Sequence, residues 1–291
     1  MKKKSSTITK AVIAVAGSGT RFLPATKAQP KEMLPVVDKP IVQYVVEEMV
    51  ASGITDIILV TKWDKKTLED HFDRSVELEY SLEQAGKKKL LEEIRVISNM
   101  ANFIYVRQKG PYGNGTPVLS AASIIKDEPF VFAWGDDMVL SKTPFTKKLI
   151  ENYNINESPV IGVQSVPKNL VDRYGIVKLR KGTKEMESVV EKPSIDKAPS
   201  RLAQFGRMIL TPEIVAILEE TKLGKGNELW VTDAIQEYVR RGGRFMTEEV
   251  LDGKWLTTGD PINYLKAVVE HALVREDIAP EFRQYLRGLD L

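Results

Sequence analysis

Short runs of aliphatic and β-branched residues alternate along the first half of the chain with segments whose apolar residues recur every three or four positions. The short runs predict strands, and the three-to-four spacing predicts amphipathic helices. The predicted elements are a strand over 11–16, a helix over 41–52, a strand over 56–61, a charge-rich helical region over 64–98, a strand over 103–106, a helix over 117–125 and a strand over 130–134. Strands and helices that alternate in this way are typical of parallel βαβ units.

The pattern changes after residue 158, where strand-like runs separated by turn residues predominate before helical spacing returns. Strands are predicted over 160–166, 176–179, 188–190 and 202–210, and helices over 212–221, 230–241, 261–274 and 279–288. The sequence contains no internal repeat and no low-complexity linker. We therefore predict one α/β domain over 1–291, with a Rossmann-like, mostly parallel central sheet flanked by helices, a smaller β-rich lobe and C-terminal helices.

The composition is that of an ordinary globular protein, and it argues against some classes of binding partner. Hydrophobic residues make up 43% of the chain and charged residues 28%, which is enough apolar surface for a sizeable core. The formal net charge is only +2, whereas a protein that binds nucleic-acid backbones usually carries a clear excess of positive charge. The chain has no cysteine, which excludes disulfides and thiolate chemistry. Its two histidines, His71 and His271, lie far apart in the sequence and are expected to be structural.

The N-terminus superficially resembles a signal peptide, because the basic residues 2–4 precede an apolar run over 11–16. That run is shorter than the roughly 7–15 residues of a typical signal-peptide core. No stretch of the sequence approaches the ~18 apolar residues that span a bilayer. We therefore expect a cytoplasmic protein without membrane contact.

The segment after the first predicted strand is rich in glycine and is followed by cations. Gly17 and Gly19 let the backbone approach a ligand closely, and successive N–H groups in such a loop can bind an anion. Arg21 can donate paired hydrogen bonds to phosphate oxygens, and Lys31 adds a mobile positive charge. The loop therefore predicts a phosphate site whose two cations suit a triphosphate.

Two common nucleotide-binding loops do not fit this segment. A Walker loop requires Lys and Ser or Thr after its second glycine, whereas Thr20 and Arg21 follow Gly19. A dinucleotide-binding loop requires a third glycine where Phe22 stands. The phosphate site is therefore of another kind.

The pattern G-x-G-T-R-x-x-P over 17–24, followed by P-K-x-x-x-P over 30–35, resembles the signature of the sugar nucleotidyltransferases. Within them the chain looks closest to the bacterial UTP–glucose-1-phosphate uridylyltransferases. The resemblance continues through Gly135-Asp136-Asp137, Glu191-Lys192-Pro193 and Leu229-Trp230-Val231-Thr232-Asp233-Ala234, and covers roughly residues 10–275.

The resemblance implies an enzyme of nucleotide-sugar biosynthesis that transfers a uridylyl group from UTP to glucose 1-phosphate, giving UDP-glucose and pyrophosphate. The sugar phosphate attacks the α-phosphorus directly, and Mg²⁺ is the implied cofactor. The nucleotide is assigned to about 8–140 and the sugar to about 141–260, with C-terminal helices over about 261–291. A homodimer or homotetramer is also implied.

The family's functional residues can be placed on matching positions of this chain. The implied nucleotide-binding residues are Ala16, Gly17, Gly19, Thr20, Arg21, Lys31, Gln108 and Gly113. The implied sugar-binding residues are Tyr174, Gly175, Glu191 and Lys192, and the implied metal ligand is Asp136. Gln108 and Gly113 match the pair that recognises uracil, since an amide can both donate and accept hydrogen bonds. Arg21, Lys31 and Lys192 are implied as catalytic because they stabilise charge at phosphorus.

The sequence departs from the family pattern at two places. Thr116-Pro117 stands where the family usually has His-Ala, and Thr257 stands where it usually has a second metal-binding Asp. Asp137 is expected to point away from Asp136 along a continuing strand, and Asp260 to cap a helix that begins at Pro261.

These departures leave two alternatives open. The first is the same chemistry with dTTP or with another sugar 1-phosphate. The second is a catalytically silent homologue that binds sugar nucleotides.

Overall fold

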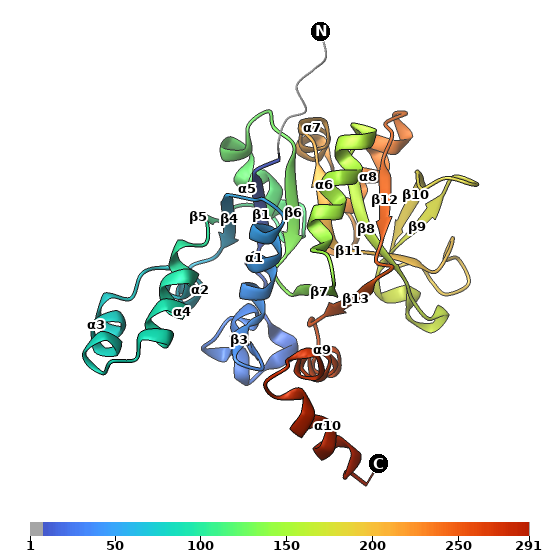
Figure 1. Ribbon diagram of the computed structural model, residues 1–291. Helices are drawn as coiled ribbons and strands as arrows, with labels where there is room; N and C mark the ends of the chain where they lie inside the picture. The colour runs from blue at the N-terminus through green and yellow to red at the C-terminus, as the bar shows by residue number, and fades with distance from the viewer. Residues whose placement is uncertain (1–7, 291) are drawn as a thin grey trace.

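The computed structural model describes residues 8–290 and is built around a nine-stranded sheet (Figure 1). Seven strands follow the order β10-β9-β11-β6-β1-β4-β5, while β8 pairs with β11 and β12 pairs with β8. The strands are β1 (Lys10–Ala14), β4 (Asp56–Thr61), β5 (Asn102–Arg107), β6 (Phe130–Trp134), β8 (Val160–Ser165), β9 (Gly175–Leu179), β10 (Met186–Glu191), β11 (Leu202–Leu210) and β12 (Met246–Glu249).

The middle of the sheet is parallel. Strands β6, β1, β4 and β5 run in one direction, which confirms the predicted α/β class with its parallel βαβ units. Strand β11 is antiparallel to β6 and to β8 and β9. The strands of the second half therefore continue the sheet edge to edge through β11, and do not lie on top of it.

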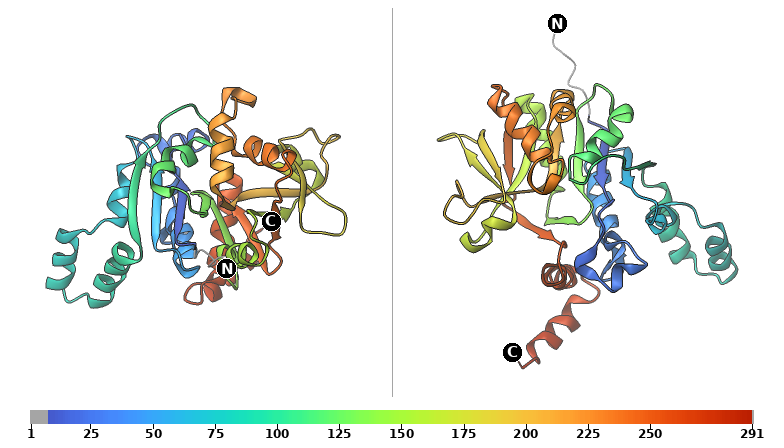
Figure 2. Two further views of the ribbon diagram at one scale, coloured as in Figure 1. Left: turned by 90° about the horizontal axis from the view of Figure 1, so that it is seen from above. Right: turned by 180° about the vertical axis from the view of Figure 1, so that it is seen from behind.

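Helices cover both faces of this sheet, and each face has its own hydrophobic cluster. Helices α1, α2 and α6 contribute buried residues to one cluster, and α5, α7 and α8 contribute to the other. The view from behind shows α5, α7 and α8 in front of the sheet (Figure 2, right). The bounds of these six helices are α1 (Ile41–Ala51), α2 (Lys66–Phe72), α5 (Thr116–Ile125), α6 (Phe145–Asn156), α7 (Pro212–Glu220) and α8 (Val231–Arg240).

The remaining helices extend from this body. Helices α3 (Val76–Gln84) and α4 (Lys88–Asn99) pack on each other and project beside the β5 edge of the sheet (Figure 1). Together with α2 they replace the single helical region that the sequence predicted over 64–98. Helices α9 (Pro261–Val274) and α10 (Ala279–Arg287) lie beyond the carboxyl ends of the central strands.

Several elements were missed from the sequence, strand β12 among them. Strands β7 (Asp137–Ser141) and β13 (Gly253–Thr257) pair in a separate two-stranded ribbon, and β7 follows β6 after only two residues, Gly135 and Asp136. Helix α6 has few buried apolar positions, chiefly Phe145 and Leu149, and ends at Glu157 with a left-handed φ of 48° in place of the usual glycine.

The two histidines are packed into the fold. The Nε2 atom of His71 lies 2.9 Å from Oε1 of Gln43, and the ring centroid of His271 lies 4.6 Å from that of Tyr44. Burial lowers the pKa of His271 to about 4, so this ring is neutral at physiological pH. The structural roles predicted for both residues are confirmed.

Between residues 8 and 290, no helix combines the length and the apolar character that crossing a membrane requires. The basic residues 2–4, which gave the N-terminus its signal-peptide appearance, lie outside the described residues.

Candidate active site

A cavity of about 350 Å³ lies at the carboxyl ends of β1 and β6, where open α/β sheets bind their ligands. Its volume lies within the range of small-molecule sites. Eleven of the predicted site residues line it: Ala16, Gly17, Arg21, Lys31, Gln108, Gly113, Asp136, Tyr174, Gly175, Glu191 and Lys192. The cavity thus brings residues from both halves of the chain together.

The other two predicted residues, Gly19 and Thr20, do not line this cavity. Gly19 has a φ of 65°, and its carbonyl accepts a hydrogen bond of 2.7 Å from Oγ1 of Thr26. Thr20 begins an exposed 3-10 turn over Thr20–Phe22. Gly19 therefore shapes the loop, since other residues rarely adopt its backbone conformation.

Lys31 and Asp136 form an ion pair in the cavity wall. The Lys31 ammonium donates a hydrogen bond to Oδ2 of Asp136. Burial alone would raise the pKa of Asp136, but Lys31 more than offsets it and holds that pKa below its usual range. Burial likewise would lower the pKa of Lys31, whereas Asp136 raises it above the ordinary value. Both groups are therefore charged at neutral pH.

A second ion pair lies beneath the first. The Lys65 ammonium lies 2.7 Å from Oε2 of Glu32, and the two side chains are only 3% and 1% exposed. Burial raises the pKa of Glu32 while Lys65 opposes that rise. Glu32 thus already has a cation partner, which leaves Asp136 as the hydrogen-bonded partner of Lys31.

The other nearby carboxylates are committed elsewhere. Oδ2 of Asp137 accepts a hydrogen bond of 2.9 Å from the main-chain N–H of Gly206, and burial, reinforced by the Asp136 charge, raises the pKa of Asp137 to about 6. Asp260 accepts from the N–H of Asn263 at 3.1 Å and caps α9. The cap predicted for Asp260 is confirmed, whereas the strand that was expected to turn Asp137 away from Asp136 ends at Trp134, and Asp137 lines the same cavity.

A divalent cation would therefore meet one protein carboxylate. Among residues 8–290 no cluster of three acidic or histidine side chains could hold a metal alone. A Cβ built on Gly259 would lie 3.5 Å from Oδ2 of Asp136 and 3.5 Å from Oγ1 of Thr257, so these two side chains approach the same point. Mg²⁺ often takes one or two protein carboxylates and completes its shell with water and phosphates. The residues therefore fit an ion that arrives with a nucleotide.

The turn that carries Asp136, residues 135–136 between β6 and β7, is held by the main chain on both sides. The N–H of Gly135 donates to the carbonyl of Ala14 at 3.0 Å, and the N–H of Thr258 donates to the carbonyl of Asp136 at 2.8 Å. We call this segment the Asp136 turn. It is fixed to the first strand and to the segment before α9.

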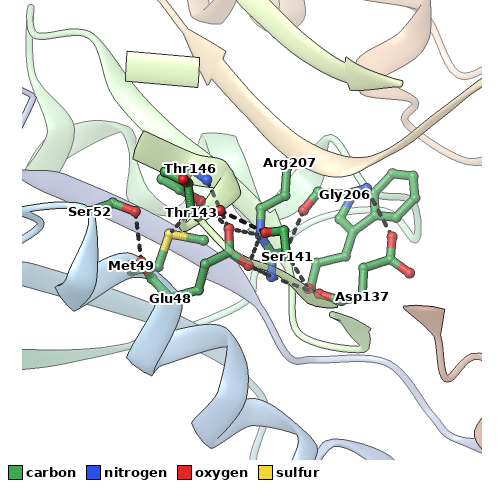
Figure 3. Close-up of polar contacts among 10 residues, drawn as sticks. Glu48, Met49, Ser52, Asp137, Ser141, Thr143, Thr146, Gly206 and Arg207 are labelled. Carbon is green, nitrogen blue, oxygen red and sulfur yellow. Dashed lines mark hydrogen bonds and ion pairs between the residues drawn. The ribbon is translucent and has the colours of Figure 1, made fainter. Parts of the chain in front are cut away.

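Arg207 holds the same turn from the interior of the protein (Figure 3). Its side chain is 0% exposed, and its Nη2 lies 3.1 Å from Oε2 of Glu48 on α1. The guanidinium also donates to the carbonyls of Asp137 at 2.7 Å and Trp134 at 3.5 Å, which flank the Asp136 turn. Glu48 in turn accepts from the N–H of Thr146 on α6 at 3.0 Å. One buried ion pair therefore joins the turn to two helices.

Among the sugar-side residues predicted from the resemblance, Glu191 and Lys192 lie beside Thr232 and Trp230, whereas the ring of Tyr174 packs edge-on against Trp255 at 5.0 Å, close to Asp137. The N–H of Lys192 donates to the carbonyl of Tyr174 at 3.0 Å, and Oε2 of Glu191 accepts from Oγ1 of Thr232 at 3.2 Å. A Cβ on Gly175 would lie 2.3 Å from Nε2 of Gln204, so any other residue there would displace the Gln204 side chain. The ends of β9 and β10 thus present Glu191 and Lys192 together.

The segment around Gly113 is bound to the segment that precedes α8. The N–H of Leu229 donates to the carbonyl of Tyr112 at 2.8 Å, and the N–H of Gly115 donates to the carbonyl of Leu229 at 2.9 Å. Gly113 has a φ of 128°, and a Cβ there would lie 2.1 Å from the Leu229 carbonyl oxygen. Gly113 is therefore needed for this close contact between the two halves of the cavity.

Several residues in and around this site have no role predicted from the sequence, namely Lys65, Trp134, Gln204, Arg207 and Trp230. Gln204 and Arg207 interrupt the otherwise apolar strand β11, which is a signal that could have found them. Nε1 of Trp134 and Oε1 of Gln204 are buried without a hydrogen-bond partner among the described residues, although both residues line the cavity. Buried polar atoms are rarely unpaired, so a polar ligand is the expected partner.

Comparison with known proteins matches residues 10–272 to the family model described as Nucleotidyl transferase. A UTP–glucose-1-phosphate uridylyltransferase of Bacillus subtilis strain 168 is 44% identical over 293 positions, which cover 99% of this chain and 97% of that protein. A UTP–glucose-1-phosphate uridylyltransferase of Staphylococcus epidermidis is 43% identical, with 98% and 99% covered.

Solved structures give the same picture. A UDP-glucose pyrophosphorylase from Acinetobacter baumannii superposes with a TM-score of 0.89 at 38% identity, covering 98% of this chain and 100% of that chain. A UTP-bound UGPase from Acinetobacter baumannii gives the same values. A UDP-glucose pyrophosphorylase complexed with UDP-glucose has a TM-score of 0.83 at 38% identity, covering 92% of this chain and 100% of that chain.

Proposed function

The chain belongs to the nucleotidyl transferase family, and from that membership we propose that it transfers a uridylyl group from UTP to glucose 1-phosphate, giving UDP-glucose and pyrophosphate. The observation that carries the proposal is the single cavity that Arg21, Lys31 and Asp136 share with Glu191 and Lys192. A triphosphate at the first group of residues and a sugar phosphate at the second would meet within it. The names of the similar uridylyltransferases support the choice of substrates.

The nucleotide is proposed to bind along the loop after β1. The backbone of Ala16, Gly17, Gly19 and Thr20 is assigned to the phosphates, together with Arg21 and Lys31. A Cβ on Gly17 would lie 3.2 Å from Cε of Lys31, which supports a close approach of backbone and cation to the ligand. Gln108 and Gly113 are assigned to uracil.

Catalysis in this proposal comes from positioning and charge. The sugar phosphate is already anionic at neutral pH, so no protein base is needed to generate the nucleophile. Its oxygen attacks the α-phosphorus, the bond to the pyrophosphate oxygen breaks, and pyrophosphate leaves with that electron pair. Arg21, Lys31 and Lys192 stabilise the charge that develops on the phosphate oxygens. Tyr174, Gly175 and Glu191 hold the sugar.

We propose Mg²⁺ as the divalent metal, held by Asp136. Mg²⁺ supplies neutralisation of phosphate charge when bound. The Lys31 ammonium pairs with Asp136, and Arg21 contributes a second positive charge beside that carboxylate. Both cations oppose a free divalent ion, and a triphosphate would draw them away from Asp136. The metal is therefore expected to bind with the nucleotide.

A second candidate function is a catalytically silent protein that binds sugar nucleotides. The observation that favours it is Thr257, which brings a hydroxyl to the point where Asp136 faces the cavity. The same chemistry with dTTP or with another sugar 1-phosphate is a narrower alternative, because base and sugar choice depend on few contacts.

The domain organisation, the cellular compartment and the oligomeric state are also proposals. We propose that the nucleotide-binding part, the sugar-binding part and the C-terminal helices work as one domain, that the protein acts in the cytoplasm, and that it forms a homodimer or homotetramer. UTP and glucose 1-phosphate are its proposed partners, with neither nucleic acid nor membrane involved.

Pyrophosphate release tests the proposal directly. The protein is mixed with Mg²⁺, UTP and glucose 1-phosphate, and separately with dTTP and with galactose 1-phosphate. Release that is fastest with UTP and glucose 1-phosphate supports the proposal. Release that is faster with another pair supports the narrower alternative. Binding of UDP-glucose without any release supports the silent homologue.

A further inference from the structure

Trp230 lies in the cavity beside Lys192 and has no role in the proposed reaction so far. Its half-buried indole ring lines the cavity, and Nζ of Lys192 lies 4.7 Å from the ring centroid. The indole N–H donates to the carbonyl of Lys225 at 2.9 Å, which fixes the rotation of the ring. An ammonium at this distance is attracted to the electron-rich face of an indole.

The ammonium has two favourable partners, the indole face and the carboxylate of Glu191. The carboxylate of Glu191 lies 3.7 Å from Nζ of Lys192, which is longer than a hydrogen bond, and its other oxygen accepts from Thr232. The Lys192 side chain is 38% exposed, and its backbone has a left-handed φ of 44°. Without the ring, the long ion pair with Glu191 would be the remaining contact of this ammonium among the described residues.

The main chain around Trp230 gives the ring a fixed base. Leu229 exchanges hydrogen bonds with Tyr112 and Gly115, and the N–H of Val231 donates to Oδ1 of Asn114 at 2.9 Å. The residues on either side of Trp230 are therefore bound to the nucleotide half of the cavity, while its ring contacts Lys192 in the sugar half.

We propose that Trp230 is a positioning residue for Lys192 and so determines affinity for the phosphate of the sugar substrate. A carboxylate at hydrogen-bond distance would neutralise the ammonium and would have to be displaced by the phosphate, whereas the Glu191 carboxylate lies 3.7 Å away. An aromatic face holds the ammonium without cancelling its charge, so that charge stays available to the incoming phosphate. The inference rests on the proposed function, which assigns Lys192 to the sugar phosphate.

The test compares Trp230→Leu and Trp230→Phe with the parent in the pyrophosphate assay. Trp230→Leu raises the KM for glucose 1-phosphate roughly three- to thirtyfold, the range of a cation–π contact, while kcat and the KM for UTP stay within about twofold. Trp230→Phe restores most of the affinity because it retains an aromatic face. Trp63→Leu is the matched control, since Trp63 is 85% exposed and does not line the cavity.

A double-mutant cycle separates positioning from a general structural effect. In the Lys192→Ala background, Trp230→Leu causes no further rise in the KM for glucose 1-phosphate. Additive effects, an equal rise in both KM values, or failure of Trp230→Phe to recover affinity would each overturn the inference.

The same cycle is measured on UDP-glucose binding by calorimetry, which needs no turnover. If the unsubstituted protein binds UDP-glucose but releases no pyrophosphate, the proposed catalysis is wrong. The binding measurements then still show whether Trp230 and Lys192 are coupled. Circular dichroism melting of every variant shows whether the fold is retained.

Discussion

The two ends of the cavity are built from different kinds of contact. Near Asp136 the supporting side chains Glu32, Lys65 and Arg207 are at most 3% exposed and are joined in ion pairs within the core. At the other end, Lys192 is 38% exposed and faces an aromatic ring. Removing one partner of a buried ion pair leaves an uncompensated charge and destabilises the fold, whereas exposed contacts change with little effect on it. The first end thus couples function to stability, and the second does not.

Apart from the loss of the metal ligand Asp136, the largest effect is expected at Lys31, which tests the difference between the two ends most directly. Lys31→Ala removes the charge aimed at the triphosphate and is expected to lower kcat by about a hundred- to a thousandfold. It also leaves Asp136 without its hydrogen-bonded cation, so some loss of stability is expected. The measurements are pyrophosphate release and circular dichroism. Activity within about threefold of the parent means that the loop after β1 has been misassigned.

Arg207 tests whether stability and function are coupled at the Asp136 end. Arg207→Met leaves Glu48 unpaired in the core and is expected to cost about 3–5 kcal/mol in the free energy of unfolding. It also frees the carbonyls that flank the Asp136 turn, so we expect kcat to fall by about tenfold or more at a temperature where the variant is folded.

Leu149→Ala is the matched control for that experiment. Leu149 is fully buried on α6, and its truncation costs about 2–5 kcal/mol without removing a hydrogen bond to the turn. Urea unfolding and pyrophosphate release are measured on both variants. If Arg207→Met and Leu149→Ala are equally destabilised and have equal turnover, Arg207 contributes to the fold and not to catalysis.

Lys192→Ala tests the end of the cavity that is assigned to the sugar phosphate. Because Lys192 is assigned to one phosphate only, the KM for glucose 1-phosphate is expected to rise by about ten- to a hundredfold, with little change in the KM for UTP or in the melting temperature. Initial-rate kinetics with each substrate varied in turn provide the measurement. A rise confined to UTP would reverse the assignment of the two ends.

The smallest effect is expected from Thr257→Asp, which adds a carboxylate beside Asp136. We expect negligible Mg²⁺ binding to the ligand-free parent and binding that is about tenfold tighter in the variant, because affinity for hard cations rises with ligand charge. Calorimetry with Mg²⁺ alone measures both. The reference variant is Asp136→Asn, which should abolish activity; tight Mg²⁺ binding to the ligand-free parent, or an active Asp136→Asn, contradicts the single-carboxylate site.

The sequence predicted those parts of the fold in which local pattern decides the structure. The buried runs that became β4, β6 and β11 have the predicted bounds, and α9 covers the predicted 261–274. That the glycine-rich segment after β1 borders the cavity was also predictable, because glycines that follow a strand let the backbone approach a ligand closely. The roles assigned to the individual residues of that loop and of the sugar side remain predictions.

Contacts between distant segments could not be predicted in this way. Arg207 and Glu48 are 159 positions apart, and no local pattern indicates that they meet. Lys65 lies in the charge-rich segment 64–98, yet its side chain is buried against Glu32. The pairing of β7 with β13 likewise depends on the assembled sheet. Each of these contacts forms only when the tertiary structure brings its two partners together.

The segment over 258–275 is the last part of the chain to contact the phosphate loop. The carbonyl of Gly259 accepts from Arg21 at 3.1 Å, the hydroxyl of Tyr264 donates to the carbonyl of Pro35 at 2.6 Å, and Arg275 pairs with Asp38 at 2.6 Å. On a ribosome the loop is synthesised among the first residues, but these three partners emerge more than 200 positions later. A nascent chain therefore lacks these three contacts to the segment after β1 until the last part of its synthesis.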